Sequence, residues 1–416
     1  MTPAQLAPRF FLAVAVILVF CKALAWLLGR VGQPAVVSEM LAGVLLGPSL
    51  FGLVLPDAQA ALFPEALHPV LYVVGQVGLV LFMFQAGYAF TAHPVRVGAG
   101  TAGVVSLAGV AAPLVLGALL VFGTARLVPV RSPGTPVAVS AAFVGVALAI
   151  TAFPMLARII TERGQAGTRH GVLALASGAV DDMVAWILLA VVLAFASGRP
   201  GPAYVTAGGA VLLALVLMVA GRRAAARLMS SPRFGDHGRL LGAVALLFVV
   251  AWYTDEIGLY AVFGAFAVGA VMPRSAATDR VVDTLTPLAA TVFLPLFFTY
   301  SGLRTEFGLL GDPAVLLFAV ACVVVAIAGK FGACWAAARL RGERNDVAMR
   351  VGALMNARGL MQLIALNVGL EAGIVTPALF TVLVLVALIT TLMATPLLDR
   401  IERRSPVENP AEMLAC

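Results

Sequence analysis

The sequence predicts an all-α membrane protein that crosses the bilayer many times. Of its 416 residues, 62% are hydrophobic and only 11% are charged, whereas a soluble domain is about 45–50% apolar and about 25% charged. The apolar residues form long runs instead of short alternating segments, which favours helices over a β-barrel. This composition excludes a soluble enzyme, a disordered chain and a fibrous repeat.

Thirteen transmembrane helices are predicted from apolar windows of about 20 residues. Their approximate limits are residues 9–28, 34–54, 68–90, 98–122, 135–160, 168–197, 203–221, 239–253, 256–273, 284–303, 313–338, 347–369 and 374–398. The first is expected to be a retained helix and not a cleaved signal peptide, because Lys22 interrupts its end and apolar sequence continues to Leu28. We therefore expect one transporter domain over residues 1–400, a short cytoplasmic tail over 401–416 and no soluble regulatory domain.

The basic residues indicate how the chain is oriented. Loops that follow odd-numbered helices, together with the C-terminal tail, hold 19 of the 27 lysines and arginines, and the loops on the other side hold 5. Positively charged loops remain in the cytoplasm, so the N-terminus should lie outside and the C-terminus in the cytoplasm. The bias towards Ala, Gly and Arg suggests a bacterial genome and hence the plasma membrane.

A weak internal repeat relates the two halves of the chain. Residues 79–87 match residues 294–302 with four identities at a constant offset of 215. The matched segments lie seven helices apart and so run in opposite directions through the membrane, as in the inverted repeats of many secondary transporters. We expect repeats over 9–197 and 239–398, with a linker helix at 203–221.

The fifth and twelfth helices each contain helix breakers at mid-depth. The fifth carries Thr151-Ala152-Phe153-Pro154, and the twelfth carries Asn356-Ala357-Arg358-Gly359 at an offset of 205. A simple kink is the alternative, because kinks are common in packed membrane helices. Paired breakers at corresponding places favour two discontinuous helices around a site.

Two adjacent carboxylates, Asp181 and Asp182, lie near the middle of the sixth predicted helix. Each charge inside a membrane costs about 2.5–3.5 kcal/mol on insertion scales, so such residues mark functional sites. Their side chains point about 100° apart, and desolvation and repulsion disfavour both being charged at once. We expect a carboxylate that exchanges a proton for a small cation; two structural aspartates neutralised by nearby donors are the alternative.

Four other polar residues enter the predicted site. Lys330 and Arg358 are the available counter-charges for the aspartates, either within the transport site or as structural compensation. Ser177 and Glu39 are accessory candidates, and Glu39 is equally compatible with a partner for the N-terminal dipole of its helix. No cofactor, resident metal or nucleic acid is expected.

Several motifs resemble those of the monovalent cation:proton antiporter-2 family, and most closely its plant-type exchangers and their bacterial relatives. The resemblance covers roughly residues 30–398 and rests on the motifs at 33–48, 151–158, 258–266 and 294–298. It implies a homodimer in which a dimerisation domain moves against a six-helix core containing two crossing broken helices. It also implies that Asp182 binds the cation and the proton, that Asp181 precedes it, that Lys330 is the nearby base, and that Thr151 and Asn356 lie near the site.

Two departures from the family pattern concern the twelfth helix. Many relatives carry an acidic residue where this chain has Leu360, and plant-type members often have Glu where it has Gln362. The transported cation is therefore left open between Na⁺ and K⁺.

The sequence therefore predicts an antiporter that exchanges a monovalent cation for protons, with membrane lipid as its surroundings. A proton-coupled exporter of an organic cation or metabolite on the same fold is the alternative. An intramembrane aspartyl protease is disfavoured because adjacent aspartates on one helix cannot embrace a peptide bond. A channel is disfavoured because too few polar residues line the predicted helices.

Overall fold

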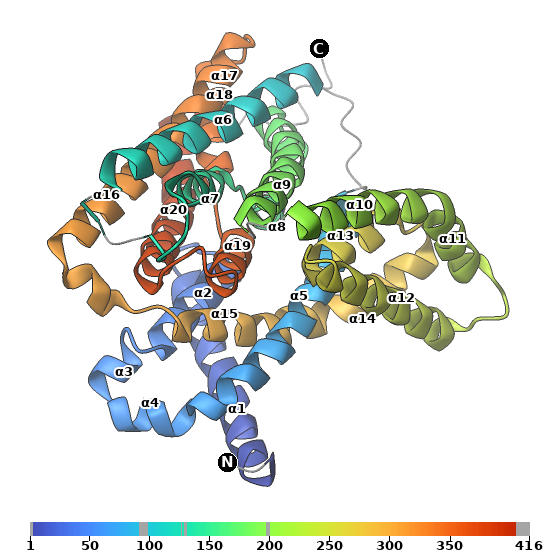
Figure 1. Cartoon of the computed structure of the whole chain (residues 1–416). Coiled ribbons are helices and arrows are strands. Elements are labelled where there is room, and N and C mark those ends of the chain that lie inside the picture. Colours follow the sequence, from blue (N-terminus) through green and yellow to red (C-terminus); the bar gives the residue numbers. More distant parts are fainter. Residues whose placement is uncertain (1–2, 91–98, 126, 129–130, 197–199, 405–416) are drawn as a thin grey trace. The chain divides into compact units, whose positions relative to one another are not determined.

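Helices make up nearly the whole of the computed structural model (Figure 1), which describes residues 3–90, 99–125, 127–128, 131–196 and 200–404. Helices from the first part of the chain are α1 (Pro3–Gly29), α2 (Ala35–Leu46), α3 (Phe51–Val54), α4 (Pro56–Leu62), η1 (Glu65–Leu67), α5 (His68–Phe90), α6 (Ala99–Thr124), α7 (Val137–Ala149), α8 (Phe153–Glu162), α9 (Arg169–Ala196), α10 (Pro200–Val216), η2 (Leu217–Gly221) and α11 (Arg222–Ser230). The remainder are α12 (Asp236–Glu256), α13 (Ala261–Val271), α14 (Ala276–Leu288), η3 (Ala289–Phe293), α15 (Leu294–Leu303), η4 (Phe307–Gly311), α16 (Pro313–Ile327), η5 (Ala328–Gly332), α17 (Ala333–Leu340), α18 (Asn345–Met355), α19 (Leu360–Glu371) and α20 (Pro377–Arg404).

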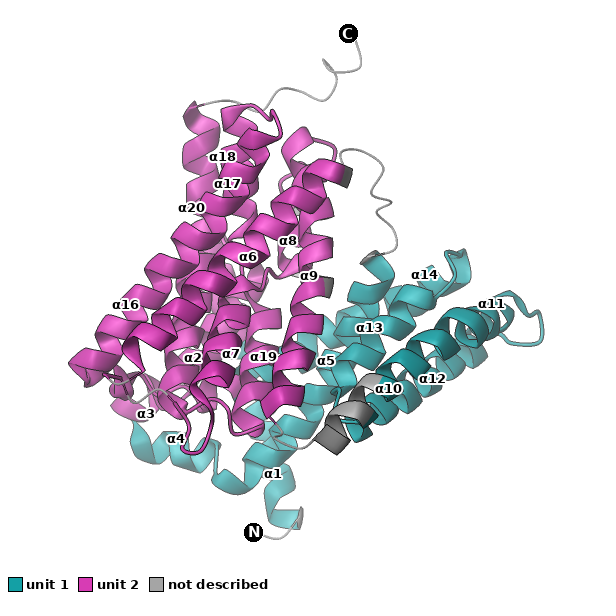
Figure 2. Cartoon of the chain, turned by 45° about the horizontal axis from the view of Figure 1, so that its top comes forward, with its two compact units in different colours: residues 1–20, 55–94, 197–300 teal, residues 21–54, 95–196, 301–416 magenta. Residues whose placement is uncertain are grey.

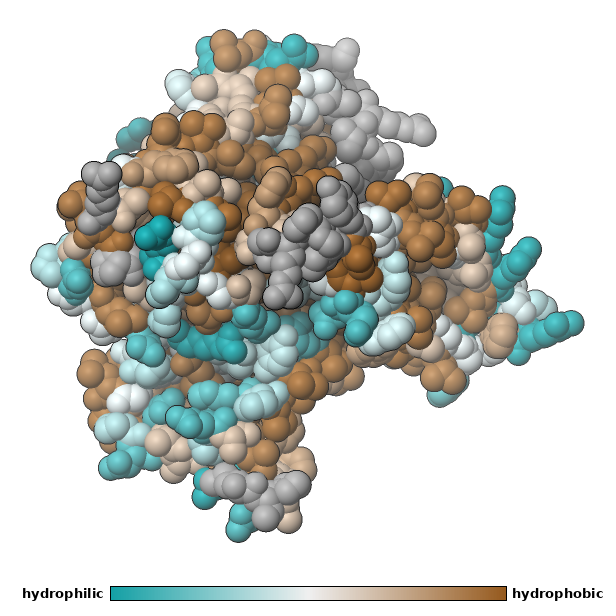
Figure 3. All heavy atoms as spheres, viewed as in Figure 1, coloured by the Kyte–Doolittle hydropathy of each residue, from teal (hydrophilic) through white to brown (hydrophobic). Residues whose placement is uncertain are grey.

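This architecture confirms the predicted all-helical fold class. Within the described residues, ten helices are long and apolar enough to cross a membrane, and α7 and α13 are shorter apolar helices. Hydrophobic residues cover much of the face seen in Figure 3, and large side chains such as Phe195 and Leu317 are more than 70% exposed. Such exposure suits helices whose outer sides meet lipid. The number of thirteen crossings stays a prediction.

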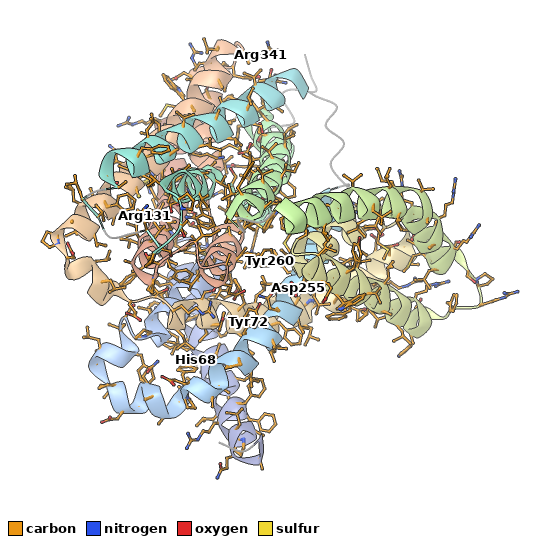
Figure 4. All side chains as sticks on the ribbon, viewed as in Figure 1. His68, Tyr72, Arg131, Asp255, Tyr260 and Arg341 are labelled. Carbon is orange, nitrogen blue, oxygen red and sulfur yellow. The ribbon has the colours of Figure 1, made fainter. Side chains whose placement is uncertain are left out.

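Several predicted boundaries differ from the structure; the helix predicted at 284–303, for example, begins at Ala276. The seventh predicted helix was expected to end near residue 221, but the helical chain continues through η2 and α11 to Ser230, because the arginine-rich segment after residue 221 is still helix-forming. The turn between the eighth and ninth predicted helices lies later than expected, at Ile257–Tyr260. Asp255 and Tyr260, labelled in Figure 4, mark its two sides.

The chain divides into two compact units, each assembled from both halves of the sequence (Figure 2). Unit 1 comprises residues 1–20, 55–94 and 197–300, and unit 2 comprises residues 21–54, 95–196 and 301–416. In unit 1, α5 packs closely on α13: a Cβ atom added at Gly87 would lie within van der Waals radii of the Phe266 carbonyl, and one at Gly269 would meet that of Phe84. Small residues of this kind let membrane helices approach backbone to backbone.

Unit 2 contains the helices with buried charges and the two interrupted helices. Helices α6 and α7 approach at Gly117 and Gly145, whose added Cβ atoms would meet the facing helix. The segment before α7 is tied to the segment before α20 by a backbone bridge between Arg131, labelled in Figure 4, and Val375. All of the predicted site residues belong to this unit.

Candidate functional site

Two breaks interrupt unit 2 at the predicted places. Helix α7 ends at Ala149 and α8 begins at Phe153, while α18 ends at Met355 and α19 begins at Leu360. The breaks touch, because the Ala152 amide donates a hydrogen bond to the Ala357 carbonyl over 3.3 Å. The prediction of two discontinuous helices is therefore confirmed, and a simple kink in each is excluded.

The local sequence explains how each second half-helix begins. Pro154 is the second residue of α8, a position where proline's missing amide hydrogen costs nothing because that donor has no partner within the helix. Gly359 precedes α19 with φ +155° and ψ −127°, a conformation that side chains disfavour. The two breaks therefore have different causes, a proline start in one and a glycine backbone in the other.

Asp181 accepts hydrogen bonds from a buried base and from a hydroxyl group. Its Oδ2 atom accepts hydrogen bonds from Lys330 Nζ at 2.6 Å and from Thr151 Oγ1 at 2.9 Å. Both members of the ion pair have no exposed side-chain surface. Thr151 Oγ1 also lies 3.3 Å from the Met355 carbonyl at the end of α18, so this residue connects the acid to both breaks.

Lys330 reaches the pair from the π-helical turn η5 between α16 and α17. Its Nζ atom lies 2.5 Å from the carbonyl of Ala149, the last residue of α7. A cation at a helix C-terminus is stabilised by the helix dipole. Lys330 therefore compensates both the Asp181 carboxylate and the broken end of α7.

Asp182 has a different environment from its neighbour. Only 2% of the residue is exposed, and neither carboxylate oxygen accepts a hydrogen bond from a side chain of the described residues. The backbone amide of Phe153, at the beginning of α8, faces the carboxylate. A buried carboxylate without a hydrogen-bonded counter-ion is costly, so this group needs a proton or a bound cation.

Arg358, predicted as a counter-charge for the aspartates, makes its hydrogen bonds to backbone carbonyls and not to either carboxylate. Its guanidinium donates to the carbonyls of Ala147 and Leu148 in the last turn of α7, and to that of Ala326 at 3.5 Å. The side chain is fully buried. Its charge therefore satisfies the end of α7, a role that depends on how the two breaks meet.

The three remaining predicted residues are Asn356, Ser177 and Glu39. Asn356 is buried in the second break, and neither end of its amide has a hydrogen-bond partner among the described residues. Ser177 lies one turn before Asp181 and donates to the Ala102 carbonyl of α6 at 3.2 Å, so it holds α9 against α6. Glu39 is the fifth residue of α2 and not part of its first turn, which removes the basis for an N-terminal dipole role.

Two residues that pack against the acid–base pair, Gly109 and Cys334, were not predicted from the sequence. A Cβ atom added at Gly109 of α6 would lie 2.6 Å from Cys334 Sγ, 3.7 Å from Lys330 Nζ and 3.8 Å from Asp181 Oδ2. With 41 glycines in the chain, this one has no distinguishing pattern. Among the described residues, no group of three or more His, Cys, Asp or Glu could hold a resident metal ion.

Interrupted, touching helices around a buried carboxylate define a secondary transporter, and comparisons with known proteins agree. The family described as "Sodium/hydrogen exchanger, transmembrane" matches residues 15–401. The Na(+)/H(+) antiporter NhaS4 of Synechocystis sp. is 34% identical over 93% of this chain and 96% of its own length. Cation/H(+) antiporter 17 of Arabidopsis thaliana is 31% identical over 94% of this chain, which spans only 48% of that relative.

A solved structure shares the fold. The sodium proton antiporter MjNhaP1 from Methanocaldococcus jannaschii superposes with a TM-score of 0.64 over 95% of this chain and 97% of its own, at 17% identity. The chain belongs to the transmembrane sodium/hydrogen exchanger family, as its motifs predicted. It is a transporter and not an enzyme.

Proposed function

We propose that this chain exchanges Na⁺ or K⁺ for protons across the plasma membrane of a bacterium, and that the two ions compete for Asp182. Cation/proton exchange is supported by membership of the family and by the names of its relatives. The observation that carries the assignment of the site is the contrast between the two aspartates. Lys330 and Thr151 donate hydrogen bonds to Asp181, whereas Asp182 accepts none from a side chain among the described residues.

Competition follows from the chemistry of one buried carboxylate. When a cation binds Asp182 the site holds a neutral pair, and when the cation leaves, a proton must take its place because the bare anion is poorly solvated. The amide at the start of α8 and the dipole of that half-helix stabilise negative charge on Asp182. Each turnover therefore moves a cation one way and protons the other, as the site opens to one side and then to the other.

Two neighbouring groups keep their contacts during this cycle and so hold the site in place. The Lys330–Asp181 pair remains closed, so the exchangeable carboxylate is Asp182 alone, while Arg358 holds the end of α7. Asn356, whose amide is unpartnered among the described residues, offers an oxygen of the kind that Na⁺ and K⁺ accept as a ligand. We further propose a homodimer, as the resemblance to the antiporter family implies. The distribution of the arginines supports an orientation with the N-terminus outside and the C-terminus in the cytoplasm.

The test is exchange in everted membrane vesicles that contain the full chain. A pH gradient is built, and its collapse on adding Na⁺, K⁺ or Li⁺ is followed with and without a clamp on the membrane potential. Wild-type protein should collapse the gradient with at least one cation, and Asp182→Asn should abolish the response because an amide cannot exchange a proton for a cation.

Asp57→Asn is the matched control, because it removes a carboxylate from the exposed helix α4. This variant should exchange normally, and the elution profile of purified Asp182→Asn should show that it is folded. Normal exchange by Asp182→Asn would refute the site. No response of wild-type protein to any alkali cation would instead favour the exporter of an organic cation.

A further inference from the structure

Unit 1 contains a charged cavity that the proposed ion exchange does not use. Its volume is about 380 Å³, within the range of about 300–1,000 Å³ that small-molecule sites occupy. One wall is the first turn of α12, and the other is the part of α14 between Ala277 and Thr284. These two helices pack against each other (Figure 2), so the cavity lies wholly within unit 1.

Two charges of each sign line this cavity. Asp236 and Arg239 come from α12, and Arg280 and Asp283 come from α14. Arg239 Nη1 lies 3.2 Å and Arg280 Nη2 lies 3.3 Å from the same oxygen atom, Asp236 Oδ1. Asp236 therefore brings together one guanidinium group from each helix.

Both kinds of charge keep unused capacity for hydrogen bonds. The Nε–H group of Arg239 is buried and has no partner among the described residues. Arg280 makes one ion-pair contact, although a guanidinium has five N–H donors. Asp283 is exposed in the cavity wall and forms no ion pair within the described part of the chain. The cavity therefore offers guanidinium donors and a free carboxylate to a ligand.

The cavity lies where its two helices enter the membrane. Residues 236–256 and 276–303 are each long and apolar enough to cross a bilayer, and the cavity is at the beginning of both. Residues 222–239 and 274–280 together hold seven arginines, which assigns this end to the cytoplasmic surface. Leu240 and Val281 also line the cavity, and the adjoining Leu241 is 71% exposed. A ligand here meets charged groups and a lipid-facing surface at once.

We propose that this cavity binds the headgroup of a phospholipid that carries both a phosphate and a primary ammonium, as phosphatidylethanolamine does. Arg239 and Arg280 hold the phosphate, because guanidinium groups bind its oxygens through charge-assisted hydrogen bonds. Asp283 accepts hydrogen bonds from the ammonium, and the acyl chains lie along the apolar surface at Leu241. Equal numbers of opposite charges favour a zwitterion over an anionic headgroup, which would leave Asp283 facing negative charge.

The experiment is thermal unfolding of the full chain in detergent with added lipids that share the same acyl chains. Phosphatidylethanolamine should raise the unfolding midpoint by about 2–4 °C more than phosphatidylglycerol or phosphatidylcholine. Phosphatidylglycerol lacks the ammonium, and the quaternary ammonium of phosphatidylcholine has no N–H donor. Free phosphoethanolamine should need a concentration at least about tenfold higher, because it lacks the apolar contacts. Equal potency of the free headgroup would overturn a lipid as the ligand.

Two variants test the two halves of the headgroup separately. Arg280→Gln should weaken binding of phosphatidylethanolamine about tenfold, because the phosphate loses one guanidinium group. Asp283→Asn should reduce the response to phosphatidylethanolamine to that of phosphatidylglycerol and leave the latter unchanged. A merely structural role would instead lower the midpoint without lipid and change the response to all three lipids alike. Both side chains are exposed, so both variants should fold.

Arg344→Gln is the matched control, because Arg344 forms an exposed ion pair with Asp346 at 3.2 Å in unit 2. This variant should keep the preference for phosphatidylethanolamine. Asp182→Asn should also bind the lipid as wild type does, so loss of ion exchange leaves this inference standing. Equal midpoint shifts with the three lipids in wild type, or an unchanged preference in Asp283→Asn, would overturn it.

Discussion

The two breaks in unit 2 are alike in sequence position but differ in how their ends are stabilised. At the first break, the carbonyls that end α7 bind two cationic side chains, Lys330 and Arg358, and the amide that begins α8 faces Asp182. At the second break, the carbonyls bind neutral donors: the Thr151 hydroxyl faces Met355, and the Ala152 amide bonds to Ala357.

Because of this difference, the two breaks should respond differently to a bound ion and to substitution. Among the described residues, the first break has ionisable side chains at both of its ends, so it can respond to the charge of a bound ion. The second break is stabilised by backbone geometry at Gly359 and by hydrogen bonds to neutral groups. We therefore expect variants at the first break to cost most, backbone variants at the second to cost less, and single neutral hydrogen bonds to cost least.

The largest effect is expected for Lys330→Met. Removing the base leaves Asp181 buried without its counter-charge, and breaking a buried pair in this way costs about 3–5 kcal/mol. Chemical unfolding in detergent measures the loss. The double variant Asp181→Asn/Lys330→Met should recover much of it, because no charge is then left unpaired. If Lys330→Met were as stable as wild type, the Lys330–Asp181 ion pair could not contribute to stability in this way.

A smaller effect is expected for Gly359→Ala at the second break. The backbone there has φ +155°, so a Cβ atom introduces strain of about 1–3 kcal/mol. The nearest heavy atoms lie at 3.5 Å, so the cost comes from conformation and not from a clash. Gly332→Ala is the control, because Gly332 has φ −62° and open space around it. Equal unfolding midpoints for the two variants would argue against strain at Gly359.

The smallest effect is expected for Thr391→Val. The Thr391 hydroxyl lies 2.6 Å from the Ala387 carbonyl of its own helix and 2.8 Å from the Arg358 carbonyl within the second break, and a neutral hydrogen bond contributes about 1 kcal/mol. Thr390→Val is a close control, since that hydroxyl bonds within its own helix, to Val386. Thermal melting of the two variants should therefore differ by a few degrees, with Thr391→Val the lower. The reverse order would show that the second break does not depend on this contact.

Much of the fold was predictable because membrane helices are defined by length and apolar composition. The predicted helix at 68–90 has the bounds of α5, and the predicted helix at 313–338 corresponds to α16–α17 within two residues. The breaks were predictable because polar strings and helix breakers interrupt apolar runs. The boundary after residue 221 was not, because a helix that continues beyond its apolar stretch leaves no hydropathy signal.

The site was predictable in its members but not in its pairing. Apart from the family resemblance, which assigned the ion to Asp182, nothing in the sequence distinguishes Asp181 from Asp182, and Lys330 and Arg358 were both expected to compensate them. Only the packing of α9 against the breaks pairs Lys330 with Asp181 and leaves Asp182 without a side-chain hydrogen-bond donor among the described residues. Arg358 turns instead to carbonyls about 210 residues away in sequence, a distance that no local pattern can express.

The sequence by itself determined that this chain is helical, lies in a membrane and carries acidic residues where lipid disfavours them. Those properties follow from composition and from the cost of charge in an apolar medium, which act on each segment separately. The tertiary structure decided which carboxylate is free, which helix end each cation stabilises and which charges meet in the cavity of unit 1. Those outcomes depend on short-range contacts between segments far apart in the chain, so they exist only once the helices have packed.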